Sequence, residues 1–307
     1  MTSWGIVSTI KAPRDEVLAF AAYHLELGAQ RLYIHLDAPD PDTFDTLKAH
    51  PKIRVFSCDD AYWRRQGVRR PAKHQARQTF NATRIHRRKA EVDWLIHMDV
   101  DEFLWPDRPV DQRLAQLPAT TLCARVRPVE VLAGGDGTSF KGFIPAGPAR
   151  DATVARLYPR FGTFVKGGFL SHLAGKLFVR TGLSDLTVKI HNVFLGEQMN
   201  PAETELQGLL LCHCHAKSWE DWLAAFHYRL EHGSYRAELA PARPRDKGGL
   251  TLHEVLSTIR DNEGDAGLRA FYDELCADTP RLRTALEAEG LLHRCDLGLA
   301  AKVEKQF

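Results

Sequence analysis

Short apolar segments alternate with amphipathic segments along the first third of the chain. Apolar runs typical of buried strands occupy residues 6–10, 32–36, 53–57 and 94–98. The residues between these runs predict helices from Pro13 to a stop at Gly28, over 44–50 and over 72–90. Strands that alternate with helices at these lengths predict a parallel sheet with helices packed on it.

The remaining two thirds of the chain carry weaker patterns. Alternating apolar residues at 122–126 indicate one more strand. Residues 133–170, rich in Gly, Pro and Phe, have no clear period and are expected to form loops around a site. Helix-capping sequences predict three further helices that begin after Ser218, Thr251 and Thr279. We therefore expect an α/β protein with a mostly parallel sheet, helices on both of its faces and a helical C-terminal region.

Composition places the chain among ordinary globular proteins. Of the 307 residues 44% are apolar and 26% are charged, which excludes a disordered chain. The net charge of +2 selects no class of partner, and no apolar run approaches the roughly 20 residues that span a bilayer. The first residues lack the pattern of a signal peptide, and the six cysteines show no disulfide framework. These features predict a reduced, cytoplasmic protein without an integral membrane segment.

Two carboxylates one residue apart are the sharpest chemical feature. Asp99 and Asp101 follow the apolar run 94–98, and Glu102 comes directly after them. Ligands of parallel α/β sheets bind at the carboxyl ends of the strands. Hard oxygen ligands in this place favour Mn²⁺ or Mg²⁺ bound together with a substrate's phosphates. The alternative is a polar turn that merely closes the strand.

A basic segment follows the third predicted strand. From Arg64 to Lys89 the chain has ten Lys or Arg residues and no carboxylate. One interpretation is a clamp for a diphosphate beside the metal, with candidates Arg65, Arg69, Arg70, Lys73 and Arg77. A solvated helix face is the alternative. A nucleic-acid surface is disfavoured, because the rest of the chain is acidic and no recognition motif is present.

Two further segments carry residues with chemical potential. In Cys212-His213-Cys214-His215, alternation along a short strand places the two histidines on one face, where one of them can complete the metal site. A structural histidine is the alternative. Near the Gly-rich residues 134–137, which are not a phosphate loop, Glu130 and Asp136 are the candidates for a general base.

Taken together, these motifs resemble a family 2-like glycosyltransferase of the GT-A fold, in the bacterial branch with an Asp-x-Asp-Glu-Phe-Leu motif. The matching residues are Lys11, Tyr23-His24, Leu27-Gly28, Asp93-Trp94-Leu95, Asp99 to Leu104, Gln75, Asn81, Lys176, His191 and 213–218. One departure is Ala12-Pro13, where relatives commonly have Asn-Glu after the lysine. The resemblance covers about residues 4–236. It implies a nucleotide-sugar-binding and catalytic domain over 1–236 and a helical extension over 237–307.

The resemblance also implies an activity and roles for the site residues. The protein would transfer a sugar from a nucleotide-diphosphate donor to a glycan or other hydroxyl acceptor, by inverting displacement, with Mn²⁺ or Mg²⁺. The metal ligands would be Asp99, Asp101 and His213, and the donor would contact Lys11, Asp37, Lys73, Arg77 and Asp99. Asp37 would contact the nucleoside. Without a membrane segment, we expect a cytoplasmic enzyme that can contact the inner membrane surface peripherally.

Two other functions are compatible with parts of the pattern. A non-catalytic module that binds carbohydrate or a polyanion would use the basic segment and the aromatic residues, and it would not need a metal. A phosphatase of the haloacid-dehalogenase type also uses strand-end aspartates, but its nucleophile lies near the first strand, and Phe103 stands where a Thr or Val is required. No base motif is readable near residues 130–140, so the identity of the catalytic base and the choice between inversion and retention stay open. The nucleobase of the donor, the sugar, the acceptor and the oligomeric state are not encoded in a readable motif either.

Overall fold

The computed structural model describes residues 2–88 and 91–307 and divides the chain into two compact units. Unit 1 comprises residues 1–127, 174–211 and 297–307, and unit 2 comprises 128–173 and 212–296. The chain therefore enters unit 2 twice and returns to unit 1 at its C-terminus. Two of the four crossings fall within strands, Cys123–Val131 and Glu203–His213, and the expected domain boundary at residue 236 stays a prediction.

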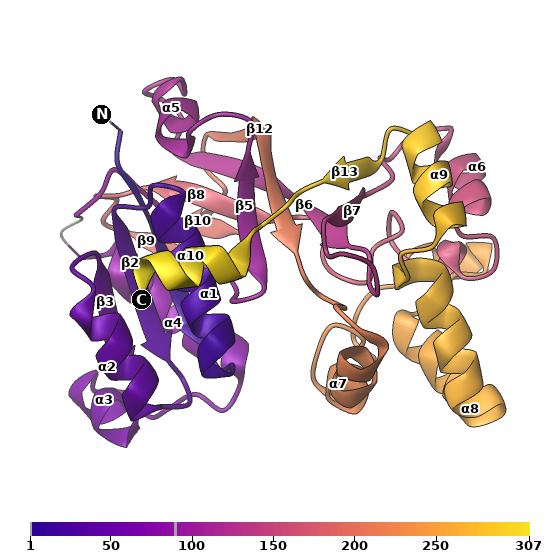
Figure 1. Cartoon of the computed structure of the whole chain (residues 1–307), viewed down its shortest axis with the longest axis horizontal. Helices are drawn as coiled ribbons and strands as arrows, with labels where there is room; N and C mark the ends of the chain where they lie inside the picture. Colours follow the sequence, from indigo (N-terminus) through magenta and orange to yellow (C-terminus); the bar gives the residue numbers. More distant parts are fainter. Residues whose placement is uncertain (1, 89–90) are drawn as a thin grey trace. The chain divides into compact units, whose positions relative to one another are not determined.

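Unit 1 contains most of the strands, and Figure 1 labels several of them, including β2, β3 and β8. Its helices are α1 (Arg14–Glu26), α2 (Pro41–Ala49), α3 (Asp60–Arg65), α4 (His74–His86), α5 (Val110–Ala115) and α10 (Leu299–Gln306). Its strands are β1 (Trp4–Ile10), β2 (Arg31–Leu36), β3 (Ile53–Ser57), β4 (Trp94–His97), β5 (Glu102–Pro106), β8 (Lys176–Arg180), β9 (Leu186–Val188), β10 (Val193–Leu195) and β11 (Gln198–Met199). Two more strands begin in unit 1 and end in unit 2: β6 (Cys123–Val131) and β12 (Glu203–His213).

The main sheet of unit 1 has a parallel half and an antiparallel half. Strands β3, β2, β1 and β4 are adjacent in that order and parallel, as expected from the alternation of strands and helices. Strands β8 and the first half of β6 continue the sheet in antiparallel orientation. The expectation of a mostly parallel sheet is therefore wrong for this half, because β8 comes from residues 176–180, for which the sequence predicted no strand.

The order of the parallel strands also sets the positions of the helices. The chain steps from β1 to β2 to β3 in one direction and then crosses back to place β4 on the other side of β1. Because such crossovers are right-handed, α1 and α2 cover one face and α4 covers the other. Val7 of β1, Leu95 of β4 and Ala82 and Ile85 of α4 share one buried cluster, in agreement with this placement. The expectation of helices on both faces is confirmed.

The boundaries of the predicted helices are close to the observed ones. Helix α1 begins one residue after Pro13, which is its N-cap rather than part of its first turn, and Gly28 follows its end with φ 100°. Helix α4 begins at His74 and ends at His86. Residues 89 and 90 of the predicted 72–90 helix lie outside the described residues.

Unit 2 contains α6 (Arg150–Leu157), α7 (Trp219–Glu231), α8 (Leu252–Cys276), α9 (Pro280–Ala288), the short 3-10 helices Gly162–Phe164 and Arg245–Lys247, and the strands β7 (Ser139–Gly142) and β13 (Leu292–Arg294). Strand β7 pairs antiparallel with β13 and with the second half of β6. Residues 133–170 are thus not only loops, because they form β7 and α6. The three predicted caps are confirmed: Ser218, Thr251 and Thr279 each accept a hydrogen bond from the first turn of the helix that follows.

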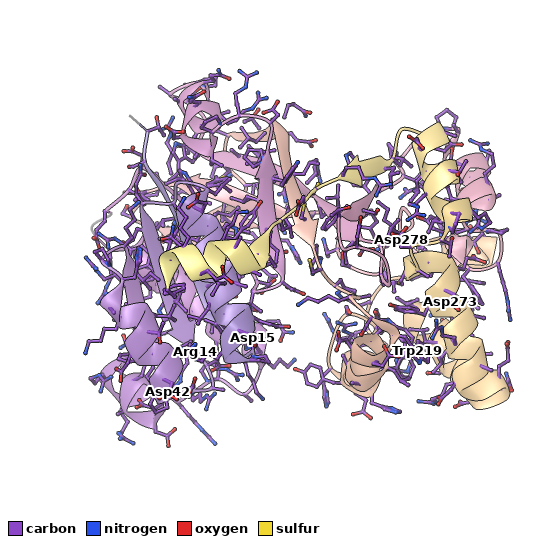
Figure 2. All side chains as sticks on the ribbon, viewed as in Figure 1. Arg14, Asp15, Asp42, Trp219, Asp273 and Asp278 are labelled. Atoms are coloured by element: carbon purple, nitrogen blue, oxygen red, sulfur yellow. The ribbon has the colours of Figure 1, made fainter. Side chains whose placement is uncertain are left out.

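The helices of unit 2 pack through aromatic side chains. Trp222 of α7 is buried, and its ring lies 5.5 Å from that of Trp219 and 5.7 Å from that of Tyr272 on α8. Figure 2 shows Trp219, at the start of α7, directed toward α8.

Among the described residues, no helix is long and apolar enough to cross a membrane.

Candidate functional site

Three polar segments meet at the carboxyl edge of the parallel strands in unit 1. Strand β1 ends before Lys11, β2 before Asp37 and β4 two residues before Asp99, and β1 lies between the other two. The Asp37 backbone N–H donates to the Ile10 carbonyl oxygen at 2.7 Å, which keeps the ends of β1 and β2 together. Chain connectivity reverses between β1 and β4, and such a reversal is where open α/β sheets bind ligands.

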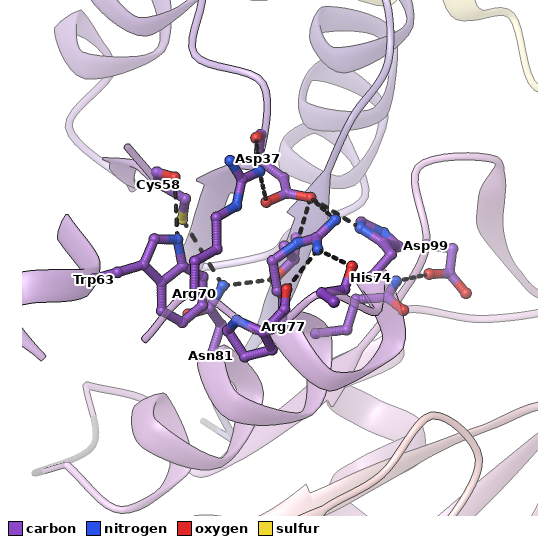
Figure 3. A network of polar contacts seen from close by, with 12 residues as sticks. Asp37, Cys58, Trp63, Arg70, His74, Arg77, Asn81 and Asp99 are labelled. Atoms are coloured by element: carbon purple, nitrogen blue, oxygen red, sulfur yellow. Dashed lines mark hydrogen bonds and ion pairs between the residues drawn. The ribbon is translucent and has the colours of Figure 1, made fainter. Parts of the chain in front are cut away.

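The first group at this edge surrounds Asp37 (Figure 3). Arg70 Nη2 donates to Asp37 Oδ1 at 2.9 Å, and Arg77 Nε donates to Oδ2 at 2.8 Å. His74 Nδ1 lies 3.0 Å from Oδ2. Burial alone would raise the pKa of Asp37, but hydrogen bonds from His74 and Arg77 and the charge of Arg77 hold that pKa well below its ordinary value. Asp37 is therefore a carboxylate enclosed by cationic side chains of the basic segment.

The second group surrounds Asp99. Gln78 Nε2 donates to Asp99 Oδ1, and Lys176 Nζ donates to Oδ2 at 2.7 Å. Lys176 Nζ also lies 3.4 Å from Glu102 Oε2, which accepts the Asp99 backbone N–H at 2.9 Å. Burial lowers the pKa of Lys176, but the charges of Asp99 and Glu102 outweigh it and raise that pKa above its ordinary value. The turn after β4 is thus held in place by a buried ammonium group.

Helix α4 connects the two groups. His74, Arg77, Gln78 and Asn81 lie at helical spacing on one face, since residues three and four apart are neighbours on a helix. His74 and Arg77 contact Asp37, while Gln78 contacts Asp99. Asn81 is buried: it donates to Thr9 Oγ1 at 3.1 Å and accepts from the Tyr62 hydroxyl at 2.6 Å, which fixes α4 to β1 and α3.

The other predicted donor contacts, Lys11 and Lys73, and the other residues of the sequence motifs have different surroundings. Lys11 is exposed at the end of β1, and Lys73 is the exposed N-cap residue of α4, without a side-chain capping bond. Gln75 is exposed, and His191 Nδ1 pairs with the Gly175 carbonyl at 2.9 Å. Tyr23 and His24 pack in the core of unit 1, where the Tyr23 hydroxyl donates to the Leu104 carbonyl at 2.7 Å.

The sequence did not identify Gln78 and Lys176 as partners of Asp99. A sequence signal for Gln78 exists, because polar residues recur at helical spacing along α4, within the segment that the sequence analysis treated only as basic. Lys176 had no such signal. It reaches Asp99 because β8 pairs antiparallel with β4, with Phe178 opposite Ile96, and nothing near residue 176 predicts that pairing.

The remaining predicted residues lie in unit 2. Glu130 is buried, accepts the Ser171 backbone N–H at 2.7 Å and lies 3.3 Å from Lys141 Nζ. Burial would raise the pKa of Glu130, but the charges of Lys141, His215 and His213 lower it. A carboxylate with a lowered pKa is a weak base. Asp136 is exposed in a turn, where it accepts hydrogen bonds from the backbone and hydroxyl of Thr138.

Strand β12 ends at His213, and His215 lies in the turn that follows, so the two histidines are not on one strand as expected. The rings of His213 and His215 are 5.2 Å apart, and His215 Nε2 lies 3.2 Å from the hydroxyl of Tyr235. That hydroxyl also accepts from Trp222 Nε1 at 3.0 Å. The role of His213 as a metal ligand, and those of Glu130 and Asp136 as bases, stay predictions. Within residues 2–88 and 91–307, no group of three or more His, Cys, Asp or Glu side chains is arranged to hold a metal ion.

Comparisons with known proteins identify no family for this chain. No family model matches the sequence, and no curated protein matches it. Among solved structures, HddC from Yersinia pseudotuberculosis matches 59% of this chain and 75% of its own, with 12% sequence identity and a TM-score of 0.27. Because no family model and no curated protein matches, the identification of the chain as a family 2-like glycosyltransferase with an Asp-x-Asp-Glu-Phe-Leu motif is wrong.

Proposed function

We propose that the chain is an enzyme that binds a nucleotide-diphosphate sugar together with a divalent cation and transfers the sugar to a hydroxyl acceptor. The observation that supports this most is that α4 contributes to both groups at the edge of the sheet. Through His74 and Arg77 it contacts the group at Asp37, and through Gln78 the group at Asp99. A nucleoside diphosphate is the class of ligand that uses such a combination of cations and metal-binding carboxylates.

The donor set near Asp99 fits Mg²⁺ or Mn²⁺. These ions bind through one or two carboxylates and complete their coordination with water and phosphate oxygens. Asp99, Asp101 and Glu102 carry three negative charges and Lys176 one positive charge, which leaves two negative charges to attract a divalent cation. Asp99 and Asp101 would hold the ion. When bound, it would stabilise the charge that develops on the leaving nucleoside diphosphate.

The protein's own side chains would orient the metal ligands and bind the phosphate groups. Gln78 and Lys176 orient Asp99, and Glu102 fixes the turn by accepting the Asp99 backbone N–H. Lys11 and Lys73 are exposed cations at the same edge and are available to phosphate oxygens. A base that deprotonates the acceptor hydroxyl is also required, and Glu130 and Asp136 remain its candidates.

The proposal is tested by calorimetric titration of UDP, GDP, CDP and dTDP, with and without Mn²⁺. We expect one nucleotide to bind only with the metal, and Asp101→Asn to weaken that binding by about tenfold or more, which is at least 1.4 kcal/mol. Asp45→Asn is the matched control, because Asp45 is an exposed carboxylate of α2 away from this edge. Release of the nucleoside diphosphate from the corresponding nucleotide sugar should then depend on the metal and on Asp101.

Two results would contradict the proposal. Absence of binding by all four nucleotides is one. Binding that needs no metal and survives Asp101→Asn is the other, and it would favour a non-catalytic module that binds polyanions through the basic segment.

A further inference from the structure

The group at Asp37 holds more positive charge than its carboxylate can neutralise. Two guanidinium groups, from Arg70 and Arg77, pair with a single carboxylate whose side chain is 0% exposed. Both carboxylate oxygens accept hydrogen bonds, Oδ1 from Arg70 and Oδ2 from Arg77. The excess positive charge is carried by the arginines, and Asp37 itself is closed to a ligand because its side chain is 0% exposed.

The two arginines differ in how much of each guanidinium is used within the chain. Arg77 is 11% exposed, and all three of its nitrogens are engaged: Nε and Nη2 contact Asp37, and Nη1 donates to the Pro71 and Ala72 carbonyls at 2.8 Å. Arg70 is 40% exposed and uses Nη2 alone, for the carboxylate and the carbonyl of Asp37. In the part of the chain that the structure describes, Arg70 Nε and Nη1 have no hydrogen-bond partner.

We propose that Asp37 is a positioning residue and that Arg70, which it holds, receives a phosphate group of the ligand. A guanidinium group binds phosphate through two parallel N–H donors, and one held in place loses less conformational freedom on binding. His74, at the first position of α4, adds a second polar side chain beside Arg70, and the positive end of the helix dipole lies there. Identifying this phosphate with the diphosphate of a nucleotide sugar rests on the proposed function. The anion site itself does not.

This assignment reverses the role expected for Asp37. A carboxylate that recognises a nucleoside must be accessible to it, whereas the side chain of Asp37 is 0% exposed beneath the arginines that bind it. The two possible roles of Asp37 also predict opposite changes in anion affinity for the substitution Asp37→Asn. If Asp37 acted only through its charge, Asp37→Asn would strengthen the binding of an anion. If Asp37 positions Arg70, the same substitution weakens it.

The experiment is calorimetric titration of inorganic pyrophosphate and inorganic phosphate in EDTA, so that no metal contributes. We expect pyrophosphate to bind, and Arg70→Gln to weaken it by about tenfold, as for loss of a charge-assisted bidentate contact. Arg70→Lys should recover only part of the affinity, because it restores the charge without the planar donor pair. Arg88→Gln is the matched control: it removes the same charge from an exposed residue beyond the C-terminal end of α4, opposite the end that carries His74, and we expect a change below about threefold.

Asp37→Asn should weaken pyrophosphate binding, and Asp37→Glu should recover part of it. Thermal unfolding shows whether each variant is folded, and if Asp37→Asn is not, the Arg70 and Arg88 variants still decide the question. Equal losses in Arg70→Gln and Arg88→Gln, or tighter binding by Asp37→Asn, would overturn the proposal.

The outcomes separate this inference from the proposed function. If pyrophosphate binding depends on Arg70 but no nucleotide binds in a metal-dependent way, the anion site at Arg70 is supported and the proposed transferase function is contradicted. If nucleotide binding depends on Mn²⁺ and Asp101 but is unchanged in Arg70→Gln, the proposed function is supported and the role of Arg70 is contradicted. If nucleoside diphosphate binds more tightly than pyrophosphate and both depend on Arg70, the phosphate belongs to the nucleotide rather than to a free anion.

Discussion

Lys176 Nζ lies 2.7 Å from Asp99 Oδ2, although Lys176 is 1% exposed and the two residues are 77 positions apart. The same ammonium lies 3.4 Å from Glu102 Oε2, so it stands between two carboxylates of the turn after β4. A buried charge persists only where its partners are held close to it. The position of the candidate metal-binding turn is therefore coupled to the start of β8.

Replacing Lys176 tests this coupling. We expect Lys176→Met to reduce the free energy of unfolding by about 3 kcal/mol, because it leaves Glu102 buried without its cation. Urea unfolding followed by circular dichroism measures the change. Lys189→Met, at an exposed position of the same unit, should change stability by less than about 0.5 kcal/mol. Adding Glu102→Gln to Lys176→Met should restore part of the loss, and no restoration would show that packing rather than charge causes it.

How far the sequence predicts this site depends on the range of the contacts. The strands β1 to β4, the helix α4 and the carboxylates at the strand ends follow from local patterns, because period and end signals are read within about ten residues. The contact of Lys176 with Asp99 depends on antiparallel pairing between distant segments, and no local pattern encodes it.

In unit 2, too, elements that depend on distant contacts are not predicted from the local sequence. Strand β7 has a buried lysine, Lys141, in its short sequence, and its charge is accommodated by Glu130 at 3.3 Å and by the carbonyls of Gly168 and Leu275. Read alone, residues 139–142 look too polar for a buried strand. Helix α6 begins after Ala149 without a side-chain cap, so it also lacks the start signal that identified α7, α8 and α9.

Four buried histidines of unit 1, His24, His35, His86 and His97, should make stability depend on pH. Burial lowers the pKa of His35 to about 3 and that of His86 to about 4. Between these values and the ordinary 6.5, the unfolded state binds more protons than the folded state. The free energy of unfolding therefore falls as pH falls below that ordinary value, by about 1.4 kcal/mol per pH unit for each histidine.

Urea unfolding at about pH 7.5 and about pH 5 measures this dependence above the range where carboxylates titrate. His35→Phe should reduce the slope by the share of one histidine, because His35 already stacks on Phe56, with ring centroids 4.5 Å apart, and a phenyl ring binds no proton. His232→Gln, at an exposed position, should leave the slope unchanged. A slope that is the same in His35→Phe as in the wild type would show that His35 titrates normally.

Glu130 should contribute to stability through Lys141. We expect Glu130→Gln to reduce the free energy of unfolding by about 3 kcal/mol, because Lys141 is buried and loses its counter-ion. Asp136→Asn, in an exposed turn, should change it by less than about 0.5 kcal/mol. The measurement is again urea unfolding. If Glu130→Gln abolishes turnover at unchanged stability, Glu130 is a base rather than a structural partner.

Arg77 and Arg70 should differ in stability although both pair with Asp37. Arg77 is largely buried and bonds the Pro71 and Ala72 carbonyls as well as Asp37, so Arg77→Gln should reduce the free energy of unfolding by about 2 kcal/mol. Arg70 is more exposed and bonds Asp37 alone, and we expect Arg70→Gln to cost less than about 1 kcal/mol because solvent screens its ion pair. Parallel urea titrations of the two variants measure the difference. Equal losses would mean that the carboxylate depends on both arginines alike, and Arg70 would then be as structural as Arg77.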